Sequence, residues 1–204
     1  MNIPPEVAQR RGRIQFLALA ALFFGPVGVA FWMYYGGHLI PSHRVNHGEL
    51  IQPTVTLPAV PTLLTADGSP VGETFLRRQW TLVYFTGDHC DDTCRHDLAD
   101  LKKVRLAMDH ERDRVHRVVL GHAPCCTSAE VGPADPDLTA AYVDSEAGRR
   151  LLAAFPPTGQ NLVGSGVIYV VDPLGNLVMR FPPDAERKGL IKDLDKLLRL
   201  SHIG

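Results

Sequence analysis

The sequence carries little net charge, and this limits the partners that electrostatics alone would select. Its 204 residues include 21 Lys and Arg against 22 Asp and Glu, for a formal net charge of -1. A neutral balance offers no electrostatic argument for binding nucleic acid. The chain also lacks long charge runs, internal repeats and low-complexity tracts. The full sequence is 45% hydrophobic and 21% charged, a composition typical of a globular protein with a buried core.

One long apolar run stands out near the N-terminus, "RIQFLALAALFFGPVGVAFWMYY" from Arg13 to Tyr35. Its length matches the roughly 20 helical residues that cross the hydrocarbon layer of a membrane. A cleaved signal peptide is the alternative, but the small-residue sequence "GVA" lies inside the apolar run instead of after it. Aromatic residues at the end of the run resemble an interfacial belt. We therefore predict an uncleaved transmembrane helix over residues 14–35.

The flanks of this run predict its orientation. Arg10, Arg11 and Arg13 precede it, whereas only Arg44 follows it closely. Positive charge stays on the cytoplasmic side, so residues 1–13 are predicted to be cytoplasmic and the rest of the chain to lie outside. In a bacterium this places a single-pass protein in the inner membrane, with residues 36–60 as a periplasmic linker rich in Gly and Pro. Disulfides can form in that compartment.

Residues 61–204 show the pattern of a single α/β domain. A hairpin is predicted around Asp67-Gly68, followed by a strand that is apolar on both faces and an amphipathic helix. A second strand, a short helix, a β-hairpin and a final helix complete the order. The expected strands are 80–85, 117–121, 167–171 and 177–181. The expected helices are one after Cys90 and Cys94 that ends near Arg112, one over 146–155 and one over about 185–200. A β-α-β crossover implies parallel central strands, and the closing hairpin makes the sheet mixed. The order predicts a thioredoxin-like fold.

Two of the four cysteines, Cys90 and Cys94, fall where the first buried strand gives way to the helix. Functional groups gather at the carboxyl ends of strands in open α/β sheets. A helix N-terminus stabilises thiolate, the form that attacks disulfides and binds soft metals. The pair therefore suits a redox dithiol, a Cu(I) site or a disulfide. A purely structural bridge would close a small loop, add little stability and occupy an exposed position.

The stretch "LVYFTGDHCDDTCRHDL" resembles the signature of the Sco/SenC family, an aromatic strand and a bend followed by C-P-D-x-C-P. The residues that match are Cys90, Asp92, Cys94, Asp97 and Leu98. The resemblance covers most of residues 46–204. It implies a membrane-anchored, thioredoxin-like protein that assists assembly of cytochrome c oxidase. It also implies that the two cysteines bind copper and act as a dithiol toward the copper-site cysteines of oxidase subunit II.

The sequence departs from that signature in two places. Asp91 and Arg95 occupy the positions of the two prolines. In the Sco/SenC family that the sequence resembles, the third copper ligand is a histidine. Counting back from Tyr169 places Gly164 at that position, within "VGSGVIYVV". These departures favour a redox dithiol over a copper site of the family's usual kind.

Other residues offer replacement ligands or a second redox pair. His122 follows the next strand and is expected at the same end of the sheet as the dithiol, so it is the candidate third copper ligand beside Cys90 and Cys94. Cys125 and Cys126 follow closely. They are candidates for a second redox pair or for additional thiolates, and two unpaired thiols are the alternative.

Three functions follow as hypotheses. The first is thiol-disulfide exchange through Cys90 and Cys94, with no cofactor required and oxidase subunit II or another copper-site assembly protein as partner. The second is a Cu(I) chaperone that binds copper through Cys90, Cys94 and a third ligand outside the family pattern. The third is an assembly or docking factor without chemistry.

Overall fold

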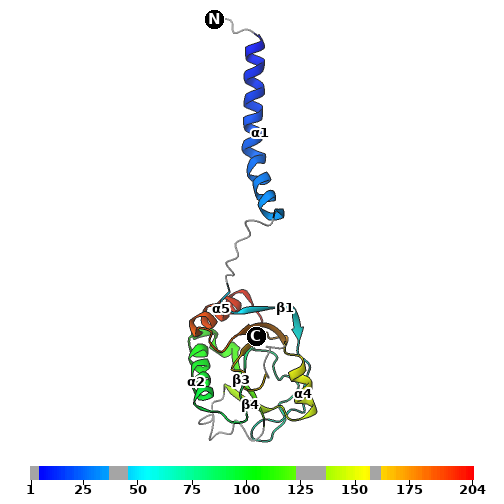
Figure 1. Ribbon diagram of the computed structural model, residues 1–204, viewed down its shortest axis with the longest axis vertical. Coiled ribbons are helices and arrows are strands. Elements are labelled where there is room, and N and C mark those ends of the chain that lie inside the picture. Colours follow the sequence, from blue (N-terminus) through cyan, green and yellow to red (C-terminus); the bar gives the residue numbers. More distant parts are fainter. Residues whose placement is uncertain (1–4, 37–45, 123–136, 157–161) are drawn as a thin grey trace. The chain divides into compact units, whose positions relative to one another are not determined.

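The computed structural model describes residues 5–36, 46–122, 137–156 and 162–204 (Figure 1). The chain divides into two compact units, residues 1–45 and residues 46–204.

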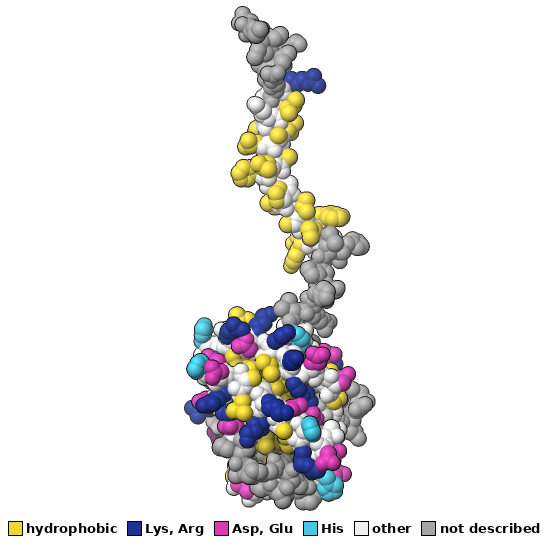
Figure 2. Space-filling view, turned by 90° about the vertical axis from the view of Figure 1, so that its left-hand side faces the viewer, with side chains coloured by type: hydrophobic (Ala, Val, Ile, Leu, Met, Phe, Trp, Pro, Cys, Tyr) yellow, Lys and Arg dark blue, Asp and Glu magenta, His cyan; other side chains and the backbone are white. Residues whose placement is uncertain are grey.

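The N-terminal unit contains one helix, α1 (Pro5–Tyr35). Its segment Gly12–Tyr35 is long and apolar enough to cross a membrane. The large apolar side chains along this segment are exposed, and Figure 2 shows them as a yellow column with dark blue near the upper end. The described part of this unit has no protein core that could bury these apolar side chains. The hydrocarbon layer of a membrane is an environment that suits them. The helix begins earlier than the predicted span, which placed its start at residue 14.

The second unit contains a six-stranded mixed sheet with the order β1-β6-β5-β2-β3-β4. The three strands β2, β3 and β4 are parallel, and β5, β6 and β1 continue the sheet in antiparallel pairs. The bounds are β1 Glu49–Thr56, β2 Trp80–Phe85, β3 Val115–Gly121, β4 Leu138–Tyr142, β5 Ile168–Val171 and β6 Asn176–Phe181. The arrangement confirms the predicted thioredoxin-like mixed sheet.

Two hydrophobic layers enclose this sheet. On one face pack α2 (Asp92–Leu106) and α5 (Arg187–Leu200), through leucines spaced three and four residues apart. On the other face pack α4 (Glu146–Ala153) and the irregular segment between β1 and β2. All six residues of β2 are buried, because the strand is covered on both faces, as its continuous apolar sequence predicts.

Several boundaries differ from the expected ones. α2 ends at Leu106 and a 3-10 helix, η1 (Asp109–Arg114), replaces the predicted last turn. The strand β4 was not predicted, because its sequence "LTAAY" is short and weakly apolar. The strand β1 lies within the segment interpreted as a linker. It is an edge strand, and its mostly exposed side chains lack the alternation that indicates a half-buried strand.

Candidate functional site

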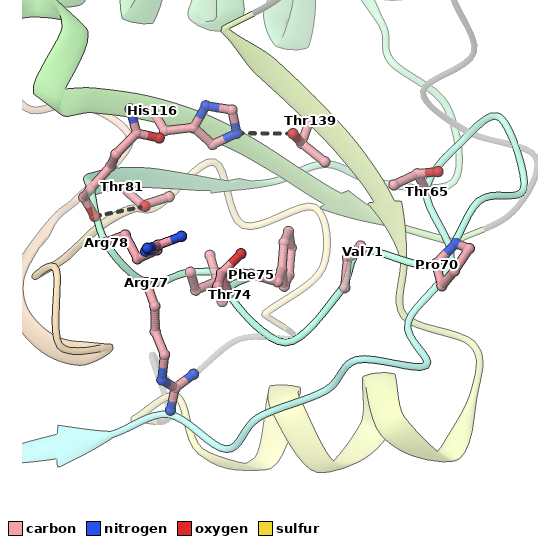
Figure 3. A pocket seen from close by; sticks show the side chains of 12 residues that line it. Thr65, Pro70, Val71, Thr74, Phe75, Arg77, Arg78, Thr81, His116 and Thr139 are labelled. Carbon is pink, nitrogen blue, oxygen red and sulfur yellow. Dashed lines mark hydrogen bonds between the residues drawn. The ribbon is translucent and has the colours of Figure 1, made fainter.

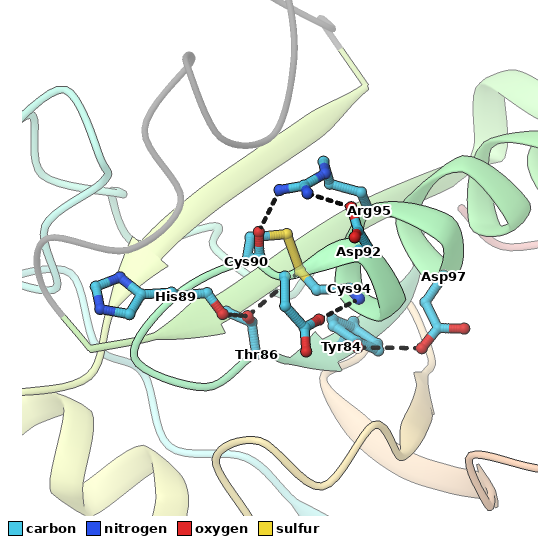
Figure 4. The surroundings of a disulfide bond; sticks show 9 residues. Tyr84, Thr86, His89, Cys90, Asp92, Cys94, Arg95 and Asp97 are labelled. Carbon is cyan, nitrogen blue, oxygen red and sulfur yellow. Dashed lines mark hydrogen bonds and ion pairs between the residues drawn. A yellow bond between two sulfur atoms is a disulfide. The ribbon is translucent and has the colours of Figure 1, made fainter.

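Cys90 and Cys94 form a disulfide just beyond the carboxyl end of β2, with their Cα atoms 5.1 Å apart (Figure 4). Cys90 lies in the loop that follows β2, and Cys94 lies in the first turn of α2. The strand-to-helix junction predicted from the sequence is thus present, and it brings the two sulfurs together.

The two residues that replace the signature prolines fix the backbone on either side of this bridge. Asp91 is the N-cap of α2, and its carboxylate accepts a hydrogen bond from the backbone N–H of Cys94 at 2.8 Å. Arg95 donates from Nη1 to the carbonyl oxygen of Cys90 at 2.7 Å and pairs with Asp92 through Nη2. Figure 4 shows the Arg95 guanidinium lying beside the disulfide. Side chains at these positions therefore provide a rigidity that proline would provide through its ring.

The disulfide is buried. Cys90 and Cys94 are 3% and 4% exposed and belong to the hydrophobic layer beneath α2. The buried hydroxyl of Thr86 donates toward Cys94 Sγ at 3.3 Å. The expectation of an exposed bridge is therefore wrong: α2 begins at Asp92, and Cys94 in its first turn faces the hydrophobic layer beneath the helix. A partner can therefore reach the sulfurs only when the structure around them moves.

A network of polar side chains connects the first two turns of α2 to the neighbouring strand β2 and helix α5. The hydroxyl of Tyr84 donates to Asp97 Oδ2 at 3.1 Å, and the other oxygen of Asp97 pairs with Arg187 of α5. Burial, and then the nearby Asp97 carboxylate, raises the pKa of the Tyr84 phenol. The phenol is therefore protonated at neutral pH and donates its hydrogen to Asp97. The network joins β2, α2 and α5 close to the disulfide.

His122 follows β3 at the same end of the sheet, as predicted. Its Nδ1 lies 2.5 Å from Asp144 Oδ1, which fixes the orientation of the ring. A hollow of about 540 Å³ separates His122 from Gly87 and Asp88 of the cysteine-bearing loop. Gly164 has a φ of 79° and lies beside Gly87, where a Cβ on Gly164 would be 3.5 Å from Gly87 Cα. A side chain at that position would meet both the left-handed backbone and this contact.

Comparisons with known proteins agree with this geometry. A family model described as transmembrane-like, thioredoxin-like, C-terminal domain matches residues 80–201, and its transmembrane-like N-terminal counterpart matches residues 5–37. The chain belongs to this transmembrane-like, thioredoxin-like family. A search of curated proteins found no match.

Solved structures of Sco proteins share the fold of this family member. Arabidopsis thaliana ScoI with copper bound is 21% identical (TM-score 0.55), with 68% of this chain and 96% of that chain covered. The apo Sco1 protein from Thermus thermophilus is 20% identical (TM-score 0.57; 76% and 99% covered). BsSco, described as a Sco-family cytochrome c oxidase assembly protein with a disulfide switch, is 16% identical (TM-score 0.53; 75% and 100% covered). At these identities the likeness establishes a Sco-like thioredoxin fold.

The metal-ligand prediction rests on Cys90, Cys94 and His122. Within the described ranges, no group of three His, Cys, Asp or Glu side chains is arranged to hold a metal ion. In the structure the two sulfurs are joined in a disulfide, and His122 as third ligand stays a prediction. Cys125 and Cys126, the predicted second pair, lie outside the described residues.

Sequence reasoning missed three contributors to the site: Thr86, the clamp made by Arg95, and the link from Tyr84 through Asp97 to Arg187. Thr86 had a usable signal, because a hydroxyl directly after a buried strand lies at the functional end of the sheet. Arg95 and Arg187 had none, since contacts between side chain and backbone or between helices leave no periodic pattern in the sequence.

Proposed function

We propose that this family member is a membrane-anchored thiol-disulfide exchange protein. The observation that carries the proposal is the Cys90–Cys94 bridge at the N-terminus of α2, with the Thr86 hydroxyl 3.3 Å from Cys94 Sγ. The helix N-terminus and this hydroxyl both stabilise a thiolate after reduction. The same hydroxyl lies 3.5 Å from the His89 carbonyl oxygen, so it also contacts the loop that carries Cys90.

The exchange step conserves atoms and electrons. In the reduced protein, the Cys90 thiolate attacks a disulfide of the client, and a mixed disulfide forms while one client sulfur leaves as thiolate and takes a proton. The Cys94 thiolate then attacks the Cys90 sulfur, which releases the second client thiolate and restores the Cys90–Cys94 bridge. Two electrons pass from the protein to the client. A periplasmic dithiol donor supplies two electrons to reduce the bridge again.

The burial of the sulfurs makes the exchange dependent on motion of the loop before α2. Arg95 closes that loop by holding the Cys90 carbonyl, and Asp92 holds Arg95 in turn. Both charged side chains are more than half exposed, so their pairing is weak and readily broken. Release of this clamp frees Cys90 while the Asp91 cap keeps Cys94 on the helix.

The client we propose is a copper-site protein at the outer face of the membrane, with cytochrome c oxidase subunit II as first candidate. Support comes from the Sco-like fold and from the description of BsSco as an oxidase assembly protein. The apolar helix over Gly12–Tyr35 supports attachment to the membrane. We place the C-terminal domain in the periplasm because the arginines cluster before the helix.

The test uses the full chain in detergent micelles with Cys125 and Cys126 replaced by Ser. The reduced protein is mixed with an oxidised copper-site domain of subunit II, and client thiols are counted over time. We expect one client disulfide reduced per protein, and an accumulated mixed disulfide through Cys90 in the Cys94→Ser variant. Client reduction that persists in Cys90→Ser would contradict the proposal.

A parallel titration separates the copper-chaperone hypothesis. Cu(I) is added to the same reduced protein in competition with a chelator, and Cys90→Ser, Cys94→Ser and His122→Ala are compared. Two results together would favour copper delivery over exchange. The first is stoichiometric Cu(I) binding that is lost in all three variants, and the second is the absence of client reduction. Failure of both assays with an intact fold would leave the docking role.

A further inference from the structure

A second hollow, of about 550 Å³, lies at the end of the sheet opposite the disulfide (Figure 3). Its walls are the segment before β2, residues 65–79, and the first residues of β2, β3 and β4. The size is that of a cavity for a small molecule. Every wall residue lies in a described part of the chain, and no step of the proposed exchange reaction uses this hollow.

The floor of the hollow is a row of polar side chains across three parallel strands. Thr81 of β2 is paired in register with His116 of β3, and His116 Nε2 lies 2.9 Å from the Thr139 hydroxyl of β4. Two residues farther along these strands the same face carries buried Val83 and Val118. The Thr81 hydroxyl is buried and donates to the Gln79 carbonyl at 3.3 Å. The Thr139 hydroxyl can donate to a ligand when His116 Nε2 carries the proton that bridges the two side chains.

The charge of the hollow has one sign. Arg77 and Arg78 line it, and none of its lining residues is acidic. Arg77 is committed to the fold, because its Nη2 donates to the Leu57 carbonyl at 2.9 Å. Arg78 is exposed, and no ion pair or side-chain hydrogen bond of it is seen in the described ranges. Figure 3 shows the Arg78 guanidinium within the hollow, whereas Arg77 points away from it.

The backbone that presents Arg78 is held in an unfavourable conformation. Leu76 and Arg78 have φ values of 58° and 74°, in the left-handed region that non-glycine residues avoid. The conformation persists because Leu76 is buried in the core and the backbone N–H of Arg78 donates to the Pro173 carbonyl at 2.8 Å. Such strained residues concentrate at ligand sites, where the surrounding structure fixes them.

From these observations we propose that the hollow binds a small organic anion, a carboxylate or a phosphate ester. Arg78 supplies the charge, and the Thr139 hydroxyl, held by His116, supplies a hydrogen bond to the oxyanion. Val71 and Phe75 form an apolar wall for the organic part of the ligand. The site lies in the same domain as the disulfide and is independent of the exchange reaction.

The test measures thermal unfolding and calorimetric binding on the full chain in micelles, with four probes at constant ionic strength. The probes are acetate, benzoate, inorganic phosphate and phenyl phosphate. We expect saturable binding with a rise in Tm, stronger for each aromatic anion than for its small counterpart. Whether benzoate or phenyl phosphate binds more tightly identifies the ligand as carboxylate or phosphate. No saturable binding of any probe would overturn the proposal.

Variants at one position separate binding from folding. Arg78→Gln should weaken anion binding about tenfold, the loss of one charged hydrogen-bonding partner, and Arg78→Lys should restore part of it. Arg78→Gly should also lose binding, while the Tm without anion stays equal or rises, because glycine accepts the positive φ. Lys196→Gln, which removes one exposed charge from α5, is the matched control. Equal loss in Lys196→Gln and Arg78→Gln would show general electrostatics and contradict the site.

Discussion

Around the disulfide, single side chains control the backbone and the sulfur chemistry separately. Asp91 and Arg95 hold the backbone on the two sides of the bridge. Thr86 alone among the three contacts a sulfur. A substitution at Thr86 should therefore change the redox equilibrium of the bridge without loosening the helix. The effect on the sulfurs can then be measured separately from effects on the backbone.

Replacement of Thr86 by Val should make the reduction potential of Cys90–Cys94 more negative by about 30 mV. The hydroxyl bonds a thiolate more strongly than a disulfide sulfur, so its loss destabilises the reduced form by about 1.4 kcal/mol. Equilibration in glutathione buffers with thiol trapping measures the shift, which should grow from pH 7 to pH 9 as thiolate increases. Thr86→Ser keeps the hydroxyl and should leave the potential near that of the wild type. An unchanged potential in Thr86→Val would remove this role.

His116 should make the stability of the domain depend on pH. Burial, the largest cause, lowers the pKa of His116; Asp137 opposes this, and Arg117 and Arg105 add to it. The unfolded chain therefore binds a proton near pH 6.5 that the folded chain binds only at lower pH, and stability falls as the pH drops below about 6.5. Urea unfolding of His116→Gln at pH 7 and pH 5 should show a smaller loss than the wild type. An equal loss in both proteins would assign the dependence to other groups.

At the scale of the elements, burial decides what the sequence reveals. The buried strand β2 and the closing pair β5 and β6 were predicted within one residue, because apolar runs and a turn signal mark them. The edge strand β1 was missed, because an exposed strand is held by backbone hydrogen bonds to β6 and not by a hydrophobic pattern. The position of the cysteine pair followed from the junction of β2 and α2. Its burial did not follow, because that depends on the residue at which α2 begins.

One carboxylate joins the beginning of the second unit to its last helix. Asp193 of α5 is 4% exposed and accepts hydrogen bonds from the backbone N–H groups of His47 and Gly48, at 2.7 and 2.8 Å. Its other oxygen lies 3.2 Å from the His47 ring. Gly189 permits this approach, because a Cβ there would lie 2.6 Å from His47 Cβ. These contacts of Asp193 with His47 and Gly48, called the clasp below, anchor the segment that leads into β1.

Asp193→Ala should lower the free energy of unfolding by about 2–4 kcal/mol, because one buried and one part-buried N–H group lose a charged acceptor. Urea unfolding measures the loss, and hydrogen exchange should show faster exchange in β1 than elsewhere in the sheet. Asp195→Ala is the matched control on the same helix. Its side chain is 43% exposed and pairs with Arg199 at the surface, a pairing worth about 0.5 kcal/mol or less. Similar losses in the two variants would exclude the clasp as a specific support.

At the scale of the whole molecule, the proposed reaction depends on which side of the membrane holds the second unit. The Cys90–Cys94 bridge is stable only in an oxidising compartment, because cytosolic reductants keep thiols reduced. The structure and the family models provide a helix suited to a single crossing. The charges beside that helix predict its orientation, so the redox state of the cysteines should follow those charges.

Replacement of Arg10, Arg11 and Arg13 by Gln should reverse part of the population. The three arginines outnumber the single Arg44 on the other side, and without them the difference in positive charge favours the opposite orientation. An alkaline phosphatase fused to the C-terminus, active only outside the cytoplasm, should lose several-fold in activity. Thiol labelling should find the inverted fraction reduced at Cys90 and Cys94. A matched replacement of three exposed basic residues of the second unit, Arg149, Arg150 and Lys196, should change neither readout. Phosphatase activity that is low in the unaltered protein would contradict the periplasmic placement and, with it, exchange with a client on that side.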